Sequence, residues 1–238
     1  SELGVYSVTI SIAGVATILS GVFNTIWAPL VYKWISEENQ VQLDKIDDVS
    51  EHLLAVIFFV VALSGFFSWV LAFVLPAEYA AAQFLITACL LGPLLYTLSE
   101  TTAIGIAIAR RTSLTMLASI GAMLVNALGN YLLVPSMGAA GAAMSTAFAF
   151  FILYVLRTEF SCLVWRKVSR LKSYMIIFLI LLAIFSDLIM QERVVSIAVW
   201  GVGFACGLFL FRPTVILGVS HLASFKDTLL LKSRGNDV

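Results

Sequence analysis

Apolar stretches long enough to cross a membrane recur along the whole chain, and no other feature restricts the fold as strongly. Hydrocarbon about 30 Å thick requires roughly 20 residues of helix. The chain is 61% hydrophobic and 12% charged, whereas soluble domains are about half apolar and a quarter charged. We therefore predict an all-α, polytopic membrane protein. We expect about seven transmembrane helices, over residues 5–31, 53–75, 80–109, 113–133, 139–156, 174–189 and 194–211.

The basic residues predict an orientation. Cytoplasmic loops of membrane proteins carry an excess of Lys and Arg. If the first stretch ends in the cytoplasm and the crossings alternate, every Lys and Arg except Arg193 falls on the cytoplasmic side. The N-terminus is then outside, and residues 212–238 form a cytoplasmic tail. This assignment puts Arg157 in a cytoplasmic loop and leaves no Lys or Arg inside any of the seven stretches.

Two polar segments and one hairpin complete the expected organisation. Residues 33–52 combine helically spaced apolar residues with many acids, which favours an amphipathic helix on the cytoplasmic surface with a solvated acidic face. Residues 157–172 are rich in Lys and Arg, which is typical of a topology signal that also contacts anionic membrane lipids. Only four residues separate the last two stretches, so residues 173–211 should form an additional transmembrane hairpin.

Glu100 is the only acid well inside an expected span. A charged carboxylate at that depth costs roughly 2.5–3.5 kcal/mol on insertion scales, so it must be neutralised, paired or hydrated. A protonated carboxyl bonded to a nearby serine or threonine is one interpretation. A carboxyl that binds a proton, a cation or sugar hydroxyls is the other. Tyr96 lies one turn earlier on the same helical face and joins Glu100 as a candidate binding residue.

Three asparagines extend the candidate site. Asn126 and Asn130 continue an i+4 row of small residues along 113–133, and Asn24 lies within the first stretch. An amide in lipid requires a partner helix or a wet cavity, so the row either packs helices together or lines a cavity. Pro135 should stop this helix because it cannot donate a backbone hydrogen bond, and residues 137–141 should form the following turn.

Several chemistries have no counterpart in the sequence. The three cysteines imply no disulfide framework, and His52 and His221 both lie outside the spans and far apart. We therefore expect no catalytic residue, no metal site and no cofactor, and a protein that is not an enzyme. A nucleic-acid partner is not expected either, since no basic block with interleaved aromatics is present.

Short motifs along residues 1–172 resemble the second half of Wzx-type polysaccharide flippases. They match in order and spacing, and they are GVYS at 4–7, FNTIWAP at 23–29, PAEY at 76–79, GIAIARRT at 105–112, Asn126 with Asn130, and Pro135 with GAAGAA at 138–143. These flippases belong to the multidrug/oligosaccharidyl-lipid/polysaccharide exporter superfamily. The resemblance implies two helical lobes around a central cavity, and alternating access.

The resemblance also implies a substrate and a place in the cell. The substrate would be a polyprenyl diphosphate-linked oligosaccharide, moved across the bacterial inner membrane for polysaccharide or lipopolysaccharide biosynthesis. Residues 1–172 would supply five helices of the C-terminal lobe. Because the sequence begins at Ser1 and turns apolar at Leu3, we expect a fragment that lacks the N-terminal lobe and one further helix.

One departure and two alternatives accompany this hypothesis. A diphosphate requires cationic partners, and with none in the seven spans we expect them in the absent lobe. An ion-coupled exporter of small amphiphilic molecules from the same superfamily is the first alternative. A membrane enzyme of polysaccharide assembly is the second, although such an enzyme should carry a long external loop with clustered polar residues, and the loops expected here are short.

Overall fold

Helices account for nearly all of the structure. The computed structural model describes residues 2–37, 40–218 and 220, and it contains no strand in these residues. The helices are α1 (Glu2–Ala13), α2 (Val15–Ser36), α3 (Gln40–Phe66), α4 (Leu71–Val74), α5 (Ala82–Ile108), α6 (Thr112–Val164), α7 (Leu171–Met190) and α8 (Arg193–Leu210), with 3₁₀ turns η1 (Ser68–Val70) and η2 (Ala77–Tyr79). The all-α prediction is confirmed.

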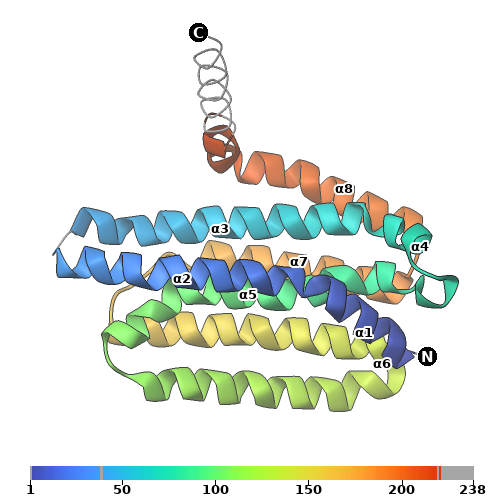
Figure 1. Cartoon of the computed structure of the whole chain (residues 1–238), viewed down its shortest axis with the longest axis horizontal. Coiled ribbons are helices and arrows are strands. Elements are labelled where there is room, and N and C mark those ends of the chain that lie inside the picture. The colour runs from blue at the N-terminus through green and yellow to red at the C-terminus, as the bar shows by residue number, and fades with distance from the viewer. Residues whose placement is uncertain (1, 38–39, 219, 221–238) are drawn as a thin grey trace, which may run out of the picture.

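Six helical segments of the described chain are long and apolar enough to cross a membrane. They agree with a multi-pass membrane protein. The continuous pair α1–α2 is one of these segments, and α6 is another, although its 53 residues turn back on themselves in two antiparallel limbs (Figure 1). Where we expected separate helices over 113–133 and 139–156, the structure has these two limbs. The number of crossings stays a prediction.

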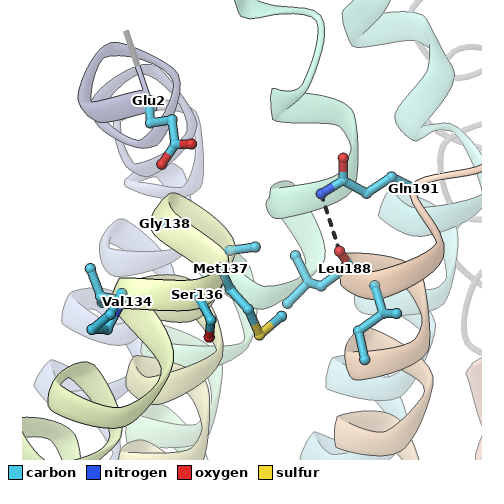
Figure 2. Close-up of a pocket in the computed structure, with 10 residues that line it drawn as sticks. Glu2, Val134, Ser136, Met137, Gly138, Leu188 and Gln191 are labelled. Atoms are coloured by element: carbon cyan, nitrogen blue, oxygen red, sulfur yellow. Dashed lines mark hydrogen bonds between the residues drawn. The ribbon is translucent and has the colours of Figure 1, made fainter.

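The reversal of α6 is made by Gly138 rather than by Pro135. Pro135 lies inside the first limb, so our prediction that it stops the helix was wrong. Gly138 adopts φ 54° and ψ −127°, a backbone conformation that side chains with a Cβ rarely tolerate. The Glu2 carboxylate accepts a hydrogen bond of 3.3 Å from the Ala139 N–H and so caps the second limb. Figure 2 shows Glu2 above this turn, beside a cavity of about 600 Å³ that Leu188 and Gln191 also line.

The polar segment 33–52 is not a separate helix. Residues to Ser36 belong to α2, and those from Gln40 begin α3, which continues without a break to Phe66. Its acids are also not simply solvated: Asp47 lies 3.3 Å from Arg166, and Glu51 pairs with Lys172. The basic segment after α6 is thus held against the start of α3. Beyond Phe66 the expected span 53–75 breaks into η1 and α4.

Helix α5 occupies the centre of the bundle and packs against α1, α2, α3 and α6 (Figure 1). Its hydroxyls explain why so polar a helix can be buried. Thr97 shares a hydrogen bond with Ser20 of α2, Thr101 accepts one from Ser50 of α3, and Thr102 shares one with Thr158 of α6. These three buried hydroxyls thereby meet partners on neighbouring helices, whereas Thr87 Oγ1 has no partner among the described residues.

Helix α7 contributes to the main core of the bundle, whereas α8 packs chiefly on α3, so the hairpin expected over 173–211 stays a prediction. The Trp200 indole of α8 donates a 3.1 Å hydrogen bond to the buried carboxylate of Asp187 on α7. The same indole packs directly on Gly65 of α3, where a side chain would overlap it. Residues 212–218 are helical as well, and His52 bonds Thr214 at 2.9 Å. The rest of the expected tail lies outside the described residues, apart from Ser220.

Most described basic residues lie at one end of the bundle. The C-terminal ends of α2, α5 and α6 share this end, while Arg193 lies at the other, with the α6 turn and the N-terminus (Figure 1). This distribution agrees with the predicted grouping of basic residues, and which end faces the cytoplasm stays a prediction. Arg157 is the exception, because it does not lie in a loop.

Candidate functional site

A cavity of about 660 Å³ lies between α1, α2, α5 and α6. Its wall is mainly apolar and aromatic. Residues on α1 and α2 form one side, Cys89, Pro93 and Tyr96 of α5 form another, and Ser119 with the second limb of α6 completes it. Drug-sized ligand sites are typically cavities of this size, with a few well-placed polar groups in an apolar lining.

Arg157 is the only Lys or Arg in this wall. It belongs to the second limb of α6 and is 6% exposed. One guanidinium nitrogen, Nη1, donates to Ser99 Oγ at 2.9 Å and to Glu100 Oε1 at 2.6 Å. The guanidinium carbon lies 5.0 Å from the centre of the Tyr96 ring, within the range of a cation–π interaction. A buried cation is therefore held on the cavity wall by a carboxylate, a hydroxyl and an aromatic ring.

Close packing of α5 on α6 brings these groups together. A Cβ at Gly105 would overlap the Ser161 hydroxyl and the Trp165 ring, so the two helices could not approach as they do with any larger residue there. The hydrogen bond between Thr102 and Thr158 crosses the same interface at 2.8 Å. Glu100 and Arg157 thus face each other one turn away from a glycine contact.

The position of Arg157 corrects the sequence prediction. We expected the helix to end at residue 156 and Arg157 to lie in a cytoplasmic loop, but α6 continues to Val164. Our expectation that Arg157 lies in a loop was therefore wrong, because this arginine belongs to a packed helix. The missed signal was the apolar spacing beyond Arg157: Phe160, Leu163 and Val164 continue a helical pattern. Hydropathy treats an arginine as a boundary, whereas this one is compensated by Glu100.

The structure brings together three of the five predicted site residues. Asn24 and Tyr96 line the cavity, and Glu100 holds Arg157 from behind without lining it. Of the three environments proposed for Glu100, the structure shows the ion pair. Ser99, Arg157 and the cavity-lining Thr146 were not among the sequence candidates.

The amide row occupies an adjoining space. Asn126 lines a second cavity of about 300 Å³ between the two limbs of α6, and its amide donates to Thr146 Oγ1 at 3.3 Å. Asn130 donates to Asn126 Oδ1 at 3.0 Å and lines neither cavity. The two cavities share four lining residues, namely Ser119, Thr146, Phe150 and Leu153. Asn126 therefore both lines a cavity and bonds the opposite limb, whereas the hydrogen bond of Asn130 stays within its own limb.

The charge pattern of the site suits an amphiphile. Arg157 pairs with Glu100 behind the wall, and Arg157 is the member of the pair that lines the otherwise apolar cavity. The described residues contain no group of three His, Cys, Asp or Glu that could hold a metal ion.

Comparisons with protein-family models, with curated proteins and with solved structures found no match for this chain. Its class therefore follows from its own helices and site: an all-α protein with several membrane-length helices and a largely apolar cavity that contains one buried arginine.

Proposed function

We propose that this chain is part of a membrane flippase that moves a lipid-linked oligosaccharide across the bacterial inner membrane by alternating access. The protein is then a transporter rather than an enzyme. The observation that carries the proposal is Arg157, a buried cation on the wall of an apolar cavity. The diphosphate of a polyprenyl-linked sugar requires a cation, and the guanidinium supplies planar donors that match phosphate oxygens.

The remaining polar groups support the same substrate class. Asn24 and Tyr96 line the first cavity and Asn126 lines the second, and amide and phenol groups of this kind can hydrogen-bond sugar hydroxyls. The motif resemblance points in the same direction. In this proposal the chain provides about seven crossings of a C-terminal lobe, with its N-terminus periplasmic and its C-terminus cytoplasmic. A second lobe and the surrounding lipid are its partners.

An exporter of small amphiphilic molecules is the second candidate. The observation in its favour is the main cavity itself, because about 660 Å³ with an apolar, aromatic wall would enclose a drug-sized molecule. The two candidates differ in cargo and share the residues that would bind it.

A transport assay separates them. The complete transporter, with its N-terminal lobe, is reconstituted and tested for flipping of a fluorescent lipid-linked oligosaccharide and for export of a small cationic dye. Arg157→Gln should slow flipping by about 10- to 100-fold, because a charge-assisted hydrogen bond contributes roughly 1.5–3 kcal/mol. Arg157→Lys keeps the charge and should retain part of the rate.

Arg170→Gln is the matched control, because it removes an arginine whose ion pair with Glu159 lies outside the cavity. It should change flipping by less than about twofold, as expected for an exposed pair. Flipping at the wild-type rate by Arg157→Gln, at normal membrane levels, would contradict the proposal. Dye export without flipping would select the second candidate.

A further inference from the structure

The basic segment 157–172, which the sequence predicted to contact anionic lipids, has little positive charge left for them. Four of its basic residues already form ion pairs within the protein, namely Arg157, Arg166, Arg170 and Lys172. Among the described residues, Lys167 is the one base of this segment that has no acidic partner. Acids of α3, α5 and α6 therefore neutralise most of the segment from within.

Uncompensated positive charge lies instead in the short turn between α5 and α6. Arg110 and Arg111 are both exposed, and neither forms an ion pair with any part of the chain that the structure describes. From residue 79 to residue 158 the sequence contains one acid, Glu100, which already pairs with Arg157. The turn thus presents two positive charges at the end of the bundle where most described bases lie (Figure 1).

The backbone of this turn favours glycine at the position of Arg110. Arg110 adopts φ 54°, a left-handed conformation that is unfavourable for a residue with a Cβ. Its N–H donates to the Ala107 carbonyl at 3.0 Å, and the Arg111 N–H donates to the Ile106 carbonyl at 3.1 Å, a pattern of helix ends that usually carries glycine. Attraction between a cation and the helix C-terminus offsets part of this cost, and a ligand for the arginine side chain would offset the rest.

Tryptophans place the turn at the level of lipid headgroups. Trp27, Trp34 and Trp165 belong to one cluster that includes Ile108, in the last turn of α5, and tryptophan is enriched at membrane–water interfaces. Arg110 follows this cluster by two residues. Beyond the turn, the first limb of α6 exposes a series of apolar side chains, namely Met116, Leu117, Ile120, Met123 and Leu124. Cationic groups therefore adjoin an exposed apolar surface of membrane-spanning length.

We propose that the Arg110–Arg111 turn binds the phosphate of an anionic membrane lipid. Guanidinium groups supply planar donors that match phosphate oxygens, and the exposed limb of α6 offers apolar surface to the acyl chains. A zwitterionic lipid brings its own ammonium group to the turn, whereas an anionic lipid adds only negative charge. A soluble phosphate would gain nothing from the apolar surface. The inference concerns the bilayer around the protein and does not depend on the proposed cargo.

Native mass spectrometry of the full chain tests this site. The protein in neutral detergent is titrated with phosphatidylglycerol, or with phosphatidylcholine that carries the same acyl chains. The dissociation constant of the first bound lipid is measured in each series. An arginine close to an anionic headgroup should tighten binding about fivefold. With two arginines, phosphatidylglycerol should therefore bind roughly 10- to 30-fold more tightly than phosphatidylcholine.

Two substitutions in the turn separate the side chains from the backbone. Arg110→Gly and Arg111→Gln should each weaken phosphatidylglycerol binding about fivefold, and the double variant should bind the two lipids equally. Misfolding would not explain the loss in Arg110→Gly, because glycine suits a backbone at φ 54°. Its Tm in neutral detergent should be at or above that of the wild type, while the rise in Tm caused by phosphatidylglycerol should shrink.

Two further variants are matched controls. Gln191→Gly makes the same kind of backbone change at the opposite end of the bundle, where Gln191 has φ 48°, and it should leave the lipid preference unchanged. Lys172→Gln removes a charge at the basic end that is already paired with Glu51. It should change the dissociation constant for phosphatidylglycerol by less than about twofold, as expected for an exposed pair.

Equal affinity of the wild type for the two lipids would overturn the inference. Unchanged binding in both arginine variants, or an equal loss in Lys172→Gln, would overturn it as well. Release of the bound lipid by millimolar inorganic phosphate would identify a site for a soluble anion and would also contradict a lipid site.

Discussion

Two ion pairs near the second limb of α6 have the same length and opposite surroundings. Arg157 lies 2.6 Å from Glu100, and Arg170 lies 2.6 Å from Glu159. The side chains of the first pair are 8% and 26% exposed, and those of the second 30% and 38%. Distance alone would rank them as equal. Their surroundings differ, however. Loss of one partner leaves a poorly hydrated charge in the Arg157 pair and a hydrated charge in the Arg170 pair.

The two pairs also occupy different parts of the molecule. The Arg170 pair belongs to a group at the basic end, where Arg166 and Lys172 connect the segment after α6 to α3. These partly exposed ion pairs hold helix ends together, and water can replace either partner. The Arg157 pair lies within the packed helices and beside a cavity, where water cannot fully replace either partner of the ion pair. Keeping the Arg157–Glu100 charges among packed helices costs free energy, and for this reason we assign a function to that pair.

The largest expected difference is in stability. Arg157→Gln should destabilise the protein by about 2–3 kcal/mol, somewhat below the usual range for a broken buried pair because Glu100 is partly exposed. Arg170→Gln should cost less than about 1 kcal/mol. Reversible unfolding in mixed micelles measures both. Equal losses for the two variants would remove the distinction between the pairs.

A smaller effect should follow from the helix contact that supports the inner pair. Gly105→Ala places a Cβ against Ser161 and the rigid Trp165 ring and should destabilise by about 1–3 kcal/mol through overpacking. Gly203→Ala is the control, because a Cβ at Gly203 meets nothing within 4 Å. Alanine there should be neutral or stabilising by up to about 1 kcal/mol.

Combining Gly105→Ala with Arg157→Gln sharpens this test. If the close approach of α5 and α6 holds the pair together, the double variant should lose less than the sum of the two single losses. Full additivity would show that the glycine contact and the ion pair are independent.

Salt should have the smallest effect and should act on only one pair. At about 1 M ionic strength the screening length is about 3 Å, which weakens exposed ion pairs far more than buried ones. The stability difference between wild type and Arg170→Gln should therefore shrink toward zero in 1 M NaCl, by less than about 1 kcal/mol. The loss in Arg157→Gln should persist, and a loss that salt abolished would mean that Arg157 is hydrated.

The sequence by itself determined the class of the protein and most of its helices. Stretches of apolar residues predicted the all-α, membrane-length architecture, and the third stretch, 80–109, closely matches α5 (Ala82–Ile108). The sequence also located the reversal within 137–141, where Gly138 makes it. These features are local, because helix length, apolar runs and glycine conformation depend on neighbouring residues.

Only the tertiary structure decided where the charges are. From the sequence, Arg157 is predicted to be a loop residue and Glu100 an isolated acid. Their 2.6 Å contact exists only because α5 packs against α6. The same holds for Asp47 and Glu51, which look solvated in sequence and lie against basic partners in the fold. The free energy of a charge depends on its hydration and on its counter-ion, and both are set by residues distant along the chain.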